Sequence, residues 1–283
     1  MTYASKKAND PIGHSPHFSA LLVRPTPYFD ESEHGYRLRL ANDNGISIPD
    51  WLGNVHSPTN QKPASGHARW CPACLKGERP YWRKSWENGP AICIQHQCWL
   101  VDICVGCNRT MSWRNSRLLT CSCGHSLLDS HSEKFSDQVV SLISGVDVFG
   151  TSPWWREISF ERRWKIAYFL GALHAYGLRG KPLKKASHAA IIAERAVMNA
   201  GAEILVGGEL EFRNLLNRIR IQPVSSVSVQ LMREAFPGLL IRMRRQLTRS
   251  ECAIFFQYML SALNTNVASD VIVIWKGKND GVR

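Results

Sequence analysis

A chain of 283 residues, 44% of them hydrophobic, is long enough for about two domains and can bury a core, so a wholly disordered protein is excluded. The formal net charge of +12 favours polyanionic partners such as nucleic acid. No apolar run approaches the length of a membrane span, and the N-terminus lacks the apolar stretch of a secretory signal, so we expect a cytoplasmic protein without a membrane partner.

The N-terminal region predicts a polar lead followed by helix. Residues 1–19 are poor in apolar side chains, which is typical of a disordered segment. From Asp30 to Asn44 the pattern predicts a helix that Asp30 or Ser32 could cap and that ends at Asn44-Gly45. A second short helix is expected after Pro49, so residues 20–60 form a helical segment that could be a helix-turn-helix. The residues of this segment expected to contact nucleic acid or a partner are Tyr36, Arg37 and Arg39.

Eight of the nine cysteines fall between Cys71 and Cys123, after a Pro-, Ser- and Gly-containing linker. Thiols stay reduced in the cytoplasm, so clustered cysteines there indicate metal rather than disulfides. Paired C-x-x-C turns place two sulfurs on one side, and a second pair from a distant turn completes a tetrahedron. The spacing therefore predicts tandem zinc ribbons over residues 66–130. The predicted ligands are Cys71, Cys74, Cys93 and His96 for one ion, and Cys104, Cys107, Cys121 and Cys123 for the other.

Three alternatives to this ligand set stay open from spacing alone. Cys98 could replace His96, His125 could replace Cys123, and the two sets could interleave instead of following one another. Each ion can take all four ligands from the chain, and no H-E-x-x-H or deaminase signature is present, so we expect structural zinc and no enzyme. Two bound ions with their thiolates lower the net charge to about +9.

Aromatic and basic residues surround these cysteines. Trp86 and Trp99 are expected to fill the small core between the metal sites, and Arg83 and Lys84 are candidate phosphate or partner contacts. The stretches concerned are RWCPACL from Arg69, YWRKSW from Tyr81, CIQHQCWL from Cys93 and CVGC from Cys104. Together with LVRPTP from Leu22 and DESEHGYRLRLA from Asp30, they resemble the TniQ/TnsD family of transposition proteins over roughly residues 20–130.

The resemblance implies a target-selection factor rather than a transposase, in a bacterial cell and associated with the nucleoid. Members of the family bind an attachment site in DNA, or dock onto a CRISPR effector complex that has found the target with its guide RNA. Both kinds recruit an AAA+ regulator that brings in the transposase, and a homodimer is expected for the family. The DNA-reading members carry a long C-terminal extension with no counterpart here, so we expect an adaptor.

Residues 132–283 predict a C-terminal helical domain. From Ser159 to Tyr176 a stripe at spacings of three and four predicts a buried face, with Arg163 outside it. The stripe comprises Phe160, Trp164, Ala167, Tyr168, Gly171 and Ala175. Further helices are expected at about 186–200, 208–220 and 250–263, the last with a Thr248–Glu251 capping box. The basic helical segment Arg242–Arg249 is a candidate nucleic-acid contact through Arg242, Arg244 and Arg245, and Val271–Trp275 is a short strand or docking peptide.

The predicted fold is mainly α: an N-terminal helical segment, tandem zinc ribbons and a C-terminal helical bundle. No phosphate-binding G-x-x-x-x-G-K-[ST] loop is present, and no motif groups three carboxylates into a two-metal recombinase site. Two rivals to the adaptor are a direct sequence-specific DNA binder and a zinc-dependent nuclease.

Overall fold

The computed structural model describes residues 22–46, 67–113, 116–146, 154–178, 191–219, 236 and 238–262. The chain divides into two compact units, the first made of Met1–Pro90 with Leu100–Ser132 and the second of Ala91–Trp99 with Glu133–Arg283. The first unit includes residues 33–43 and most of the cysteine block. Across the described ranges, no helix is long and apolar enough to cross a membrane.

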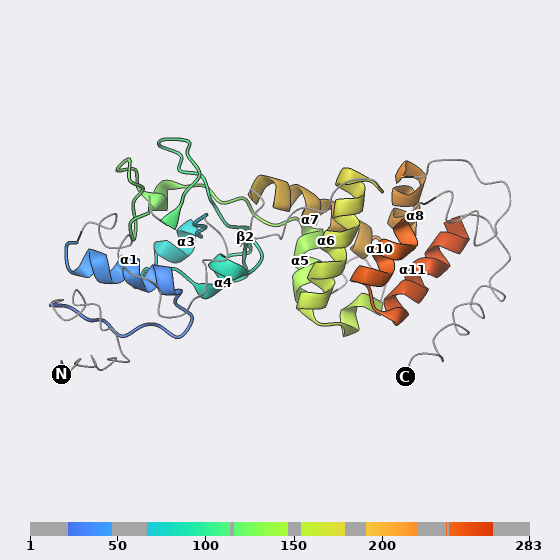
Figure 1. The fold of residues 1–283 in the computed structure, drawn as a ribbon, viewed down its shortest axis with the longest axis horizontal. Coiled ribbons are helices and arrows are strands. Elements are labelled where there is room, and N and C mark those ends of the chain that lie inside the picture. Colours follow the sequence, from blue (N-terminus) through green and yellow to red (C-terminus); the bar gives the residue numbers. More distant parts are fainter. Residues whose placement is uncertain are drawn as a thin grey trace, which may run out of the picture. The chain divides into compact units, whose positions relative to one another are not determined.

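The first unit begins with helix α1, Glu33–Asp43 (Figure 1). Of the two predicted caps, Ser32 is the one used, since its Oγ accepts the Gly35 N–H at 2.9 Å. The helix ends at Asn44, and Gly45 follows with a φ of 64°, as the Asn-Gly pair predicts. The expected second helix near Pro49 lies outside the described residues, as do the predicted disordered lead and the linker apart from His67.

A tryptophan cluster forms the core of the first unit. The rings of Trp70, Trp86 and Trp113 lie 5.1–6.2 Å, centroid to centroid, from the ring of Trp82. The indole N–H of Trp70 donates to the Leu127 carbonyl and that of Trp82 to the Leu118 carbonyl, so the buried polar atoms are paired. The remaining regular elements are short: α3 (Pro72–Leu75), α4 (Lys84–Asn88) and the 3₁₀ helix η3 (Leu127–Asp129).

Strand β1 (Ile92–Cys93) pairs antiparallel with β2 (Cys98–Trp99) to form a short hairpin in the second unit. The Trp99 N–H donates to the Glu133 carbonyl at 2.8 Å, and the Phe135 N–H donates to the Gln97 carbonyl at 3.1 Å. The Trp99 ring packs against Phe135 and Trp164, which buries the ring as predicted for a core residue. The hairpin is therefore built into the second unit by backbone bonds and by aromatic packing.

The described helices of the second unit form a bundle in which α5, α6 and α7 lie side by side (Figure 1). A Cβ added to Gly171 of α6 would lie 1.8 Å from the Val197 carbonyl oxygen of α7, and one on Gly201 would lie 1.8 Å from the Ala167 oxygen of α6. Only glycine allows the two backbones to cross this closely. The helices are α5 (Asp137–Ser144), α6 (Phe160–Tyr176), α7 (Ile191–Val206), α8 (Gly208–Ile219), α10 (Leu239–Gln246) and α11 (Arg249–Ala262), with the 3₁₀ helix η4 (Trp154–Glu157).

The mainly α class and the main helix positions are confirmed, and the details need three corrections. The first concerns helix bounds: α7 continues to Val206, past the predicted end at residue 200, and α10 stops at Gln246 instead of running through Arg249. Ala175 was predicted in the buried stripe of α6 but is exposed. The predicted strand at Val271–Trp275 lies outside the described residues.

The third correction concerns Arg163, which was predicted outside the buried face but is only 6% exposed. Its guanidinium donates to the Leu142 and Ile143 carbonyls at 2.7 and 3.0 Å, and to the Ile158 carbonyl at 2.6 Å. The last carbonyls of a helix lack hydrogen-bond donors within the helix. At the end of α5, the Arg163 guanidinium is the donor for two of them. Burial of this guanidinium lowers its pKa.

Candidate metal sites and basic surfaces

The first Cys/His cluster gathers Cys71, Cys74, Cys93 and His96, the four residues predicted from spacing. Their ligand atoms all lie within 4.8 Å of one another, and the Cys93 Sγ is 3.5 Å from the His96 Nδ1. Cys71 caps α3 and Cys74 lies one turn later, so the short helix points both sulfurs the same way. Cys98, an open alternative, is buried opposite Cys93 in the hairpin and does not belong to this group.

The hairpin that carries Cys93 and His96 is held at its base by Glu194. The Glu194 Oε1 accepts the Ala91 N–H at 3.0 Å, across 103 positions of sequence, and the side chain is fully buried in α7. At the tip of the hairpin, the Lys134 ammonium donates to the His96 carbonyl at 2.8 Å. In the sequence, Glu194 is only a single carboxylate in the apolar first turns of a helix, so its role could be found only from the tertiary contact.

The second Cys/His cluster gathers Cys104, Cys107, Cys121 and Cys123, all in the first unit. The Sγ atoms of Cys104 and Cys123 are 3.7 Å apart, and those of Cys107 and Cys121 are 3.8 Å apart. The turn after Cys107 uses the positive φ of Asn108, 53°, and the turn after Cys123 uses that of Gly124, 88°. Both turns bend the chain sharply enough to bring each sulfur pair inward.

His125, the other open alternative, does not belong to this second group. Its ring packs on Gly106, where an added Cβ would lie 2.6 Å from the His125 Cβ. Its backbone carbonyl accepts the Cys121 N–H at 2.9 Å, which closes the second turn. His125 therefore supports the two turns through packing and through its main chain.

In the second cluster, the Cys104 thiol is protonated at neutral pH in the metal-free chain. Burial raises the pKa of the Cys104 thiol to about 11, although the backbone N–H groups of Cys107 and Gly106 act in the opposite direction. Those N–H groups stabilise a thiolate on Cys104. A divalent cation that binds here must displace the proton, so its affinity rises with pH.

Both clusters fit a tetrahedral metal ion. A metal–sulfur bond of about 2.3 Å places two sulfurs of a tetrahedron roughly 3.8 Å apart. The sulfur separations of 3.7 and 3.8 Å in the second cluster match this value without any movement of the chain. Each cluster supplies four protein ligands and fills the coordination shell, an arrangement that suits a structural role and leaves no position for substrate.

All three predicted contact residues on α1 lie against neighbouring side chains. Arg39 is buried and binds Glu31 through its Nε at 2.8 Å and its second nitrogen at 2.6 Å. The Glu31 hydrogen bond raises the pKa of Arg39, and Tyr36 lies half-buried with its ring under the same guanidinium. Arg37 pairs with Glu33 one turn earlier. These residues contribute first to the packing of α1.

The other predicted contact residues are more accessible. Lys84 is exposed at the start of α4, whereas Arg83 pairs with Asp30 at 2.5 Å and stacks on Tyr81. On α10 the side chains of Arg244 and Arg245 are exposed, and Arg242 reaches the Gly177 carbonyl at 3.4 Å. The structure therefore leaves basic surface at α4 and at α10.

Comparison with known proteins adds no family assignment. No protein-family model matches the chain, and no curated protein matches it significantly. Functional inference therefore depends on the residues of this chain and on their geometry.

Proposed function

We propose that this chain is a TniQ-like adaptor of DNA transposition that links a target-bound complex to an AAA+ regulator and its transposase. The observation that carries the proposal is the pair of consecutive four-ligand clusters, at the spacings on which the family resemblance depends. The chain works by binding and does not turn over a substrate.

In this proposal each cluster holds one zinc ion with a structural role, and the clusters form tandem zinc ribbons. Three thiolates with one imidazole, and four thiolates, are the ligand sets that structural zinc prefers. The ions add to the tryptophan core by fixing turns that a segment with so little regular structure would otherwise hold only weakly. A helix-turn-helix that includes α1 is part of the proposal, and its second helix falls outside the described residues.

The distribution of basic side chains supports a bridging role. Lys84 is exposed in the first unit, and Arg244 and Arg245 are exposed in the second. A chain with accessible cations in both units can contact a nucleoprotein complex at more than one place. Metal occupancy keeps the cysteine-bearing surface in one conformation, which is what recruitment of a partner requires.

The test is affinity purification of the tagged chain from its native host, with nuclease treatment and a high-salt wash before mass spectrometry and RNA sequencing. We expect an AAA+ regulator in the eluate, with a CRISPR effector and its guide RNA if targeting is RNA-guided. A Lys84→Ala, Arg244→Ala, Arg245→Ala triple variant should recover less of the nucleoprotein partner. A matched Lys165→Ala variant removes an exposed lysine that pairs with Glu161 on α6, and it should behave like the wild type.

The exposed arginines of α10 also favour a second candidate, direct binding to a DNA site. A regulator in the eluate without any guide complex, together with selection of one duplex by the purified chain, would favour this candidate. Absence of a transposition regulator from every eluate would contradict both candidates. Metal-dependent DNA cleavage that disappears on changing one carboxylate in a folded chain would favour the nuclease instead.

A further inference from the structure

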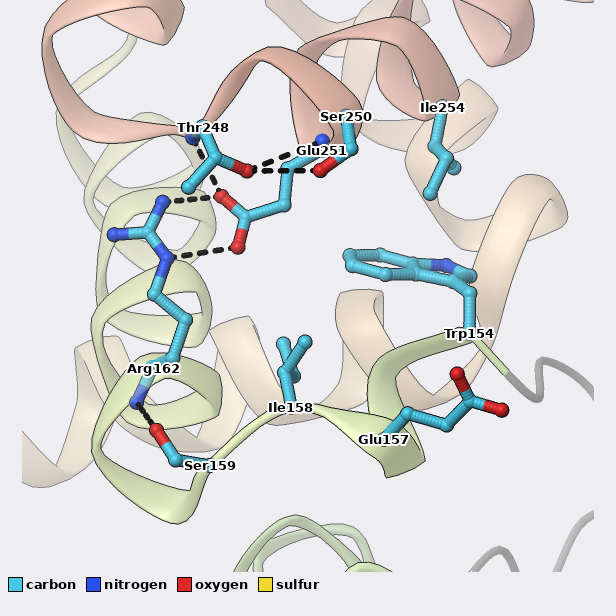
Figure 2. A pocket seen from close by; sticks show the side chains of 9 residues that line it. All are labelled: Trp154, Glu157, Ile158, Ser159, Arg162, Thr248, Ser250, Glu251 and Ile254. Carbon is cyan, nitrogen blue, oxygen red and sulfur yellow. Dashed lines mark hydrogen bonds and ion pairs between the residues drawn. The ribbon is translucent and has the colours of Figure 1, made fainter.

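A pocket of about 760 Å³ in the second unit lies where η4, the start of α6 and the start of α11 meet (Figure 2). Its apolar lining comes from Trp154, Ile158 and Ile254. The Trp154 ring is fixed edge-on against Phe255, with the ring centroids 5.6 Å apart and the planes at 90°. The pocket belongs to neither Cys/His cluster and to none of the predicted contact residues.

One wall of the pocket is polar, and its charges are already paired. The Arg162 Nε donates to the Glu251 Oε1 at 2.7 Å, a second guanidinium nitrogen binds the Glu251 Oε2, and that nitrogen also donates to the Gln246 carbonyl at 2.9 Å. The Glu251 carboxylate in turn accepts the Thr248 N–H at 2.7 Å, which neutralises the positive end of α11. This wall has no spare charge for a ligand.

The opposite wall carries a carboxylate with no such partner. Glu157 is exposed, and among the described residues no cation pairs with it. Figure 2 shows its carboxylate on the Trp154 side of the pocket, away from the Arg162–Glu251 pair. An aromatic face and an unpaired carboxylate on one wall form a favourable environment for a cation.

We propose that this pocket binds an arginine side chain of a partner peptide, with a neighbouring apolar residue seated on Ile158 and Ile254. The planar guanidinium stacks on the Trp154 indole and forms an ion pair with Glu157, which a phosphate or carboxylate could not do. An anionic ligand would meet two carboxylates, Glu157 and Glu251, and one guanidinium that is already bonded. The pocket would thus be a protein-docking site that is distinct from the basic surfaces.

Peptide binding in this pocket goes beyond the proposed adaptor function and does not depend on it. The test measures peptide binding directly, so its result is independent of whether the chain recruits a transposition regulator. The chain is labelled with 5-fluorotryptophan, and a Trp154→Phe variant assigns the fluorine resonance of Trp154. The probes are acetyl-Leu-Arg-Leu-amide and its Gln and Glu counterparts. We expect the Arg peptide to shift the Trp154 resonance saturably, at least tenfold more tightly than the Gln peptide, and the Glu peptide not to bind.

Glu157→Gln should weaken binding of the Arg peptide about tenfold. Glu161→Gln should leave it unchanged, because Glu161 is exposed on α6, pairs with Lys165 and does not line the pocket. Both changes are at exposed positions, so an unchanged thermal transition confirms that each variant is folded. Equal binding of all three peptides, preference for the Glu peptide, no binding at all, or a larger shift with a DNA oligonucleotide would each overturn the proposal.

Discussion

The two units of the molecule obtain their order from different sources. In the described part of the first unit the regular elements other than α1 span three to five residues, and the core is rich in tryptophan. This unit contains all four residues of the second cluster, but only Cys71 and Cys74 of the first. The second unit contains helices of up to 17 residues that approach one another through paired glycines. We infer that the first unit needs metal to hold its conformation and that the bundle does not.

The comparison has a physical basis. A segment with little backbone pairing gains little from hydrogen bonds and must fix its turns by other means, such as metal coordination and indole N–H bonds to carbonyls. A helix satisfies its own backbone, so packing of an apolar face is enough to stabilise it. The hairpin Ala91–Trp99 combines both situations, since it carries metal-ligand candidates but is anchored to the bundle.

The largest expected effect comes from removing the second cluster with a Cys104→Ser, Cys107→Ser double variant. Structural zinc contributes on the order of 10 kcal/mol to the folding of small metal domains, so the first unit should lose its packing. We expect a red shift of tryptophan emission, loss of one zinc per chain by mass spectrometry, and a retained helical signal in circular dichroism.

The matched control for that experiment is Cys252→Ala. Cys252 is buried in α11 and belongs to neither cluster, so the zinc content of the Cys252→Ala variant should equal that of the wild type. If the helical signal of the double variant collapsed together with the tryptophan signal, the comparison between the units would fail.

The second prediction breaks the bundle without touching the metal. In Gly201→Ala the new methyl carbon would lie 1.8 Å from the Ala167 carbonyl oxygen, so α6 and α7 must move apart, at a cost of about 3 kcal/mol. Urea unfolding followed by circular dichroism measures the loss, and the zinc content should stay at two ions. Ala196→Ser, at an exposed position of α7, should change stability by less than about 0.5 kcal/mol. Equal stability of both variants would rule out the close crossing.

The third prediction tests whether the anchoring of the hairpin by Glu194 supports metal binding at the first cluster. Glu194→Ala removes the acceptor of the Ala91 N–H, so metal affinity of the first cluster should fall about 10- to 100-fold while that of the second is kept. Cobalt titration followed by absorption resolves the two sites. Glu194→Gln keeps an acceptor oxygen and should restore much of the affinity, and Glu203→Ala, exposed on α7, should have no effect. A uniform loss at both clusters would point to a general folding defect instead.

The smallest expected effect concerns Glu251. Burial alone would raise the pKa of this carboxyl, but the hydrogen bonds from Arg162 and Thr248 hold it below its ordinary value. Its contribution, about 1–2 kcal/mol, is therefore present above the pKa of an unfolded glutamate and lost as the pH falls through the lowered value. Acid titration of thermal stability should be flatter in Glu251→Gln than in the wild type. A parallel pair of curves would show that Glu251 does not carry this pH dependence.

The sequence by itself determined both cysteine clusters and most helix positions. Ligand spacing is a local constraint: Cys71 and Cys74 lie on one short turn whatever the rest of the chain does. The same holds for caps such as Ser32 and the Thr248–Glu251 box, since each acts within three residues. The buried roles of Trp86 and Trp99 also followed from composition around the clusters.

Only the tertiary structure decided which charged residues are buried and hydrogen-bonded in the interior. Arg39, Arg163 and Glu194 carry the same local signal as solvated side chains, but each is buried and hydrogen-bonded to a group outside its own helix. The choice between His96 and Cys98 was likewise open from spacing alone, and in the structure it is His96 whose ligand atom lies within 4.8 Å of those of Cys71, Cys74 and Cys93. Burying a charged side chain costs free energy that only a hydrogen-bond partner can offset. Because the fold brings that partner into place, the local sequence does not show which charged residues are buried.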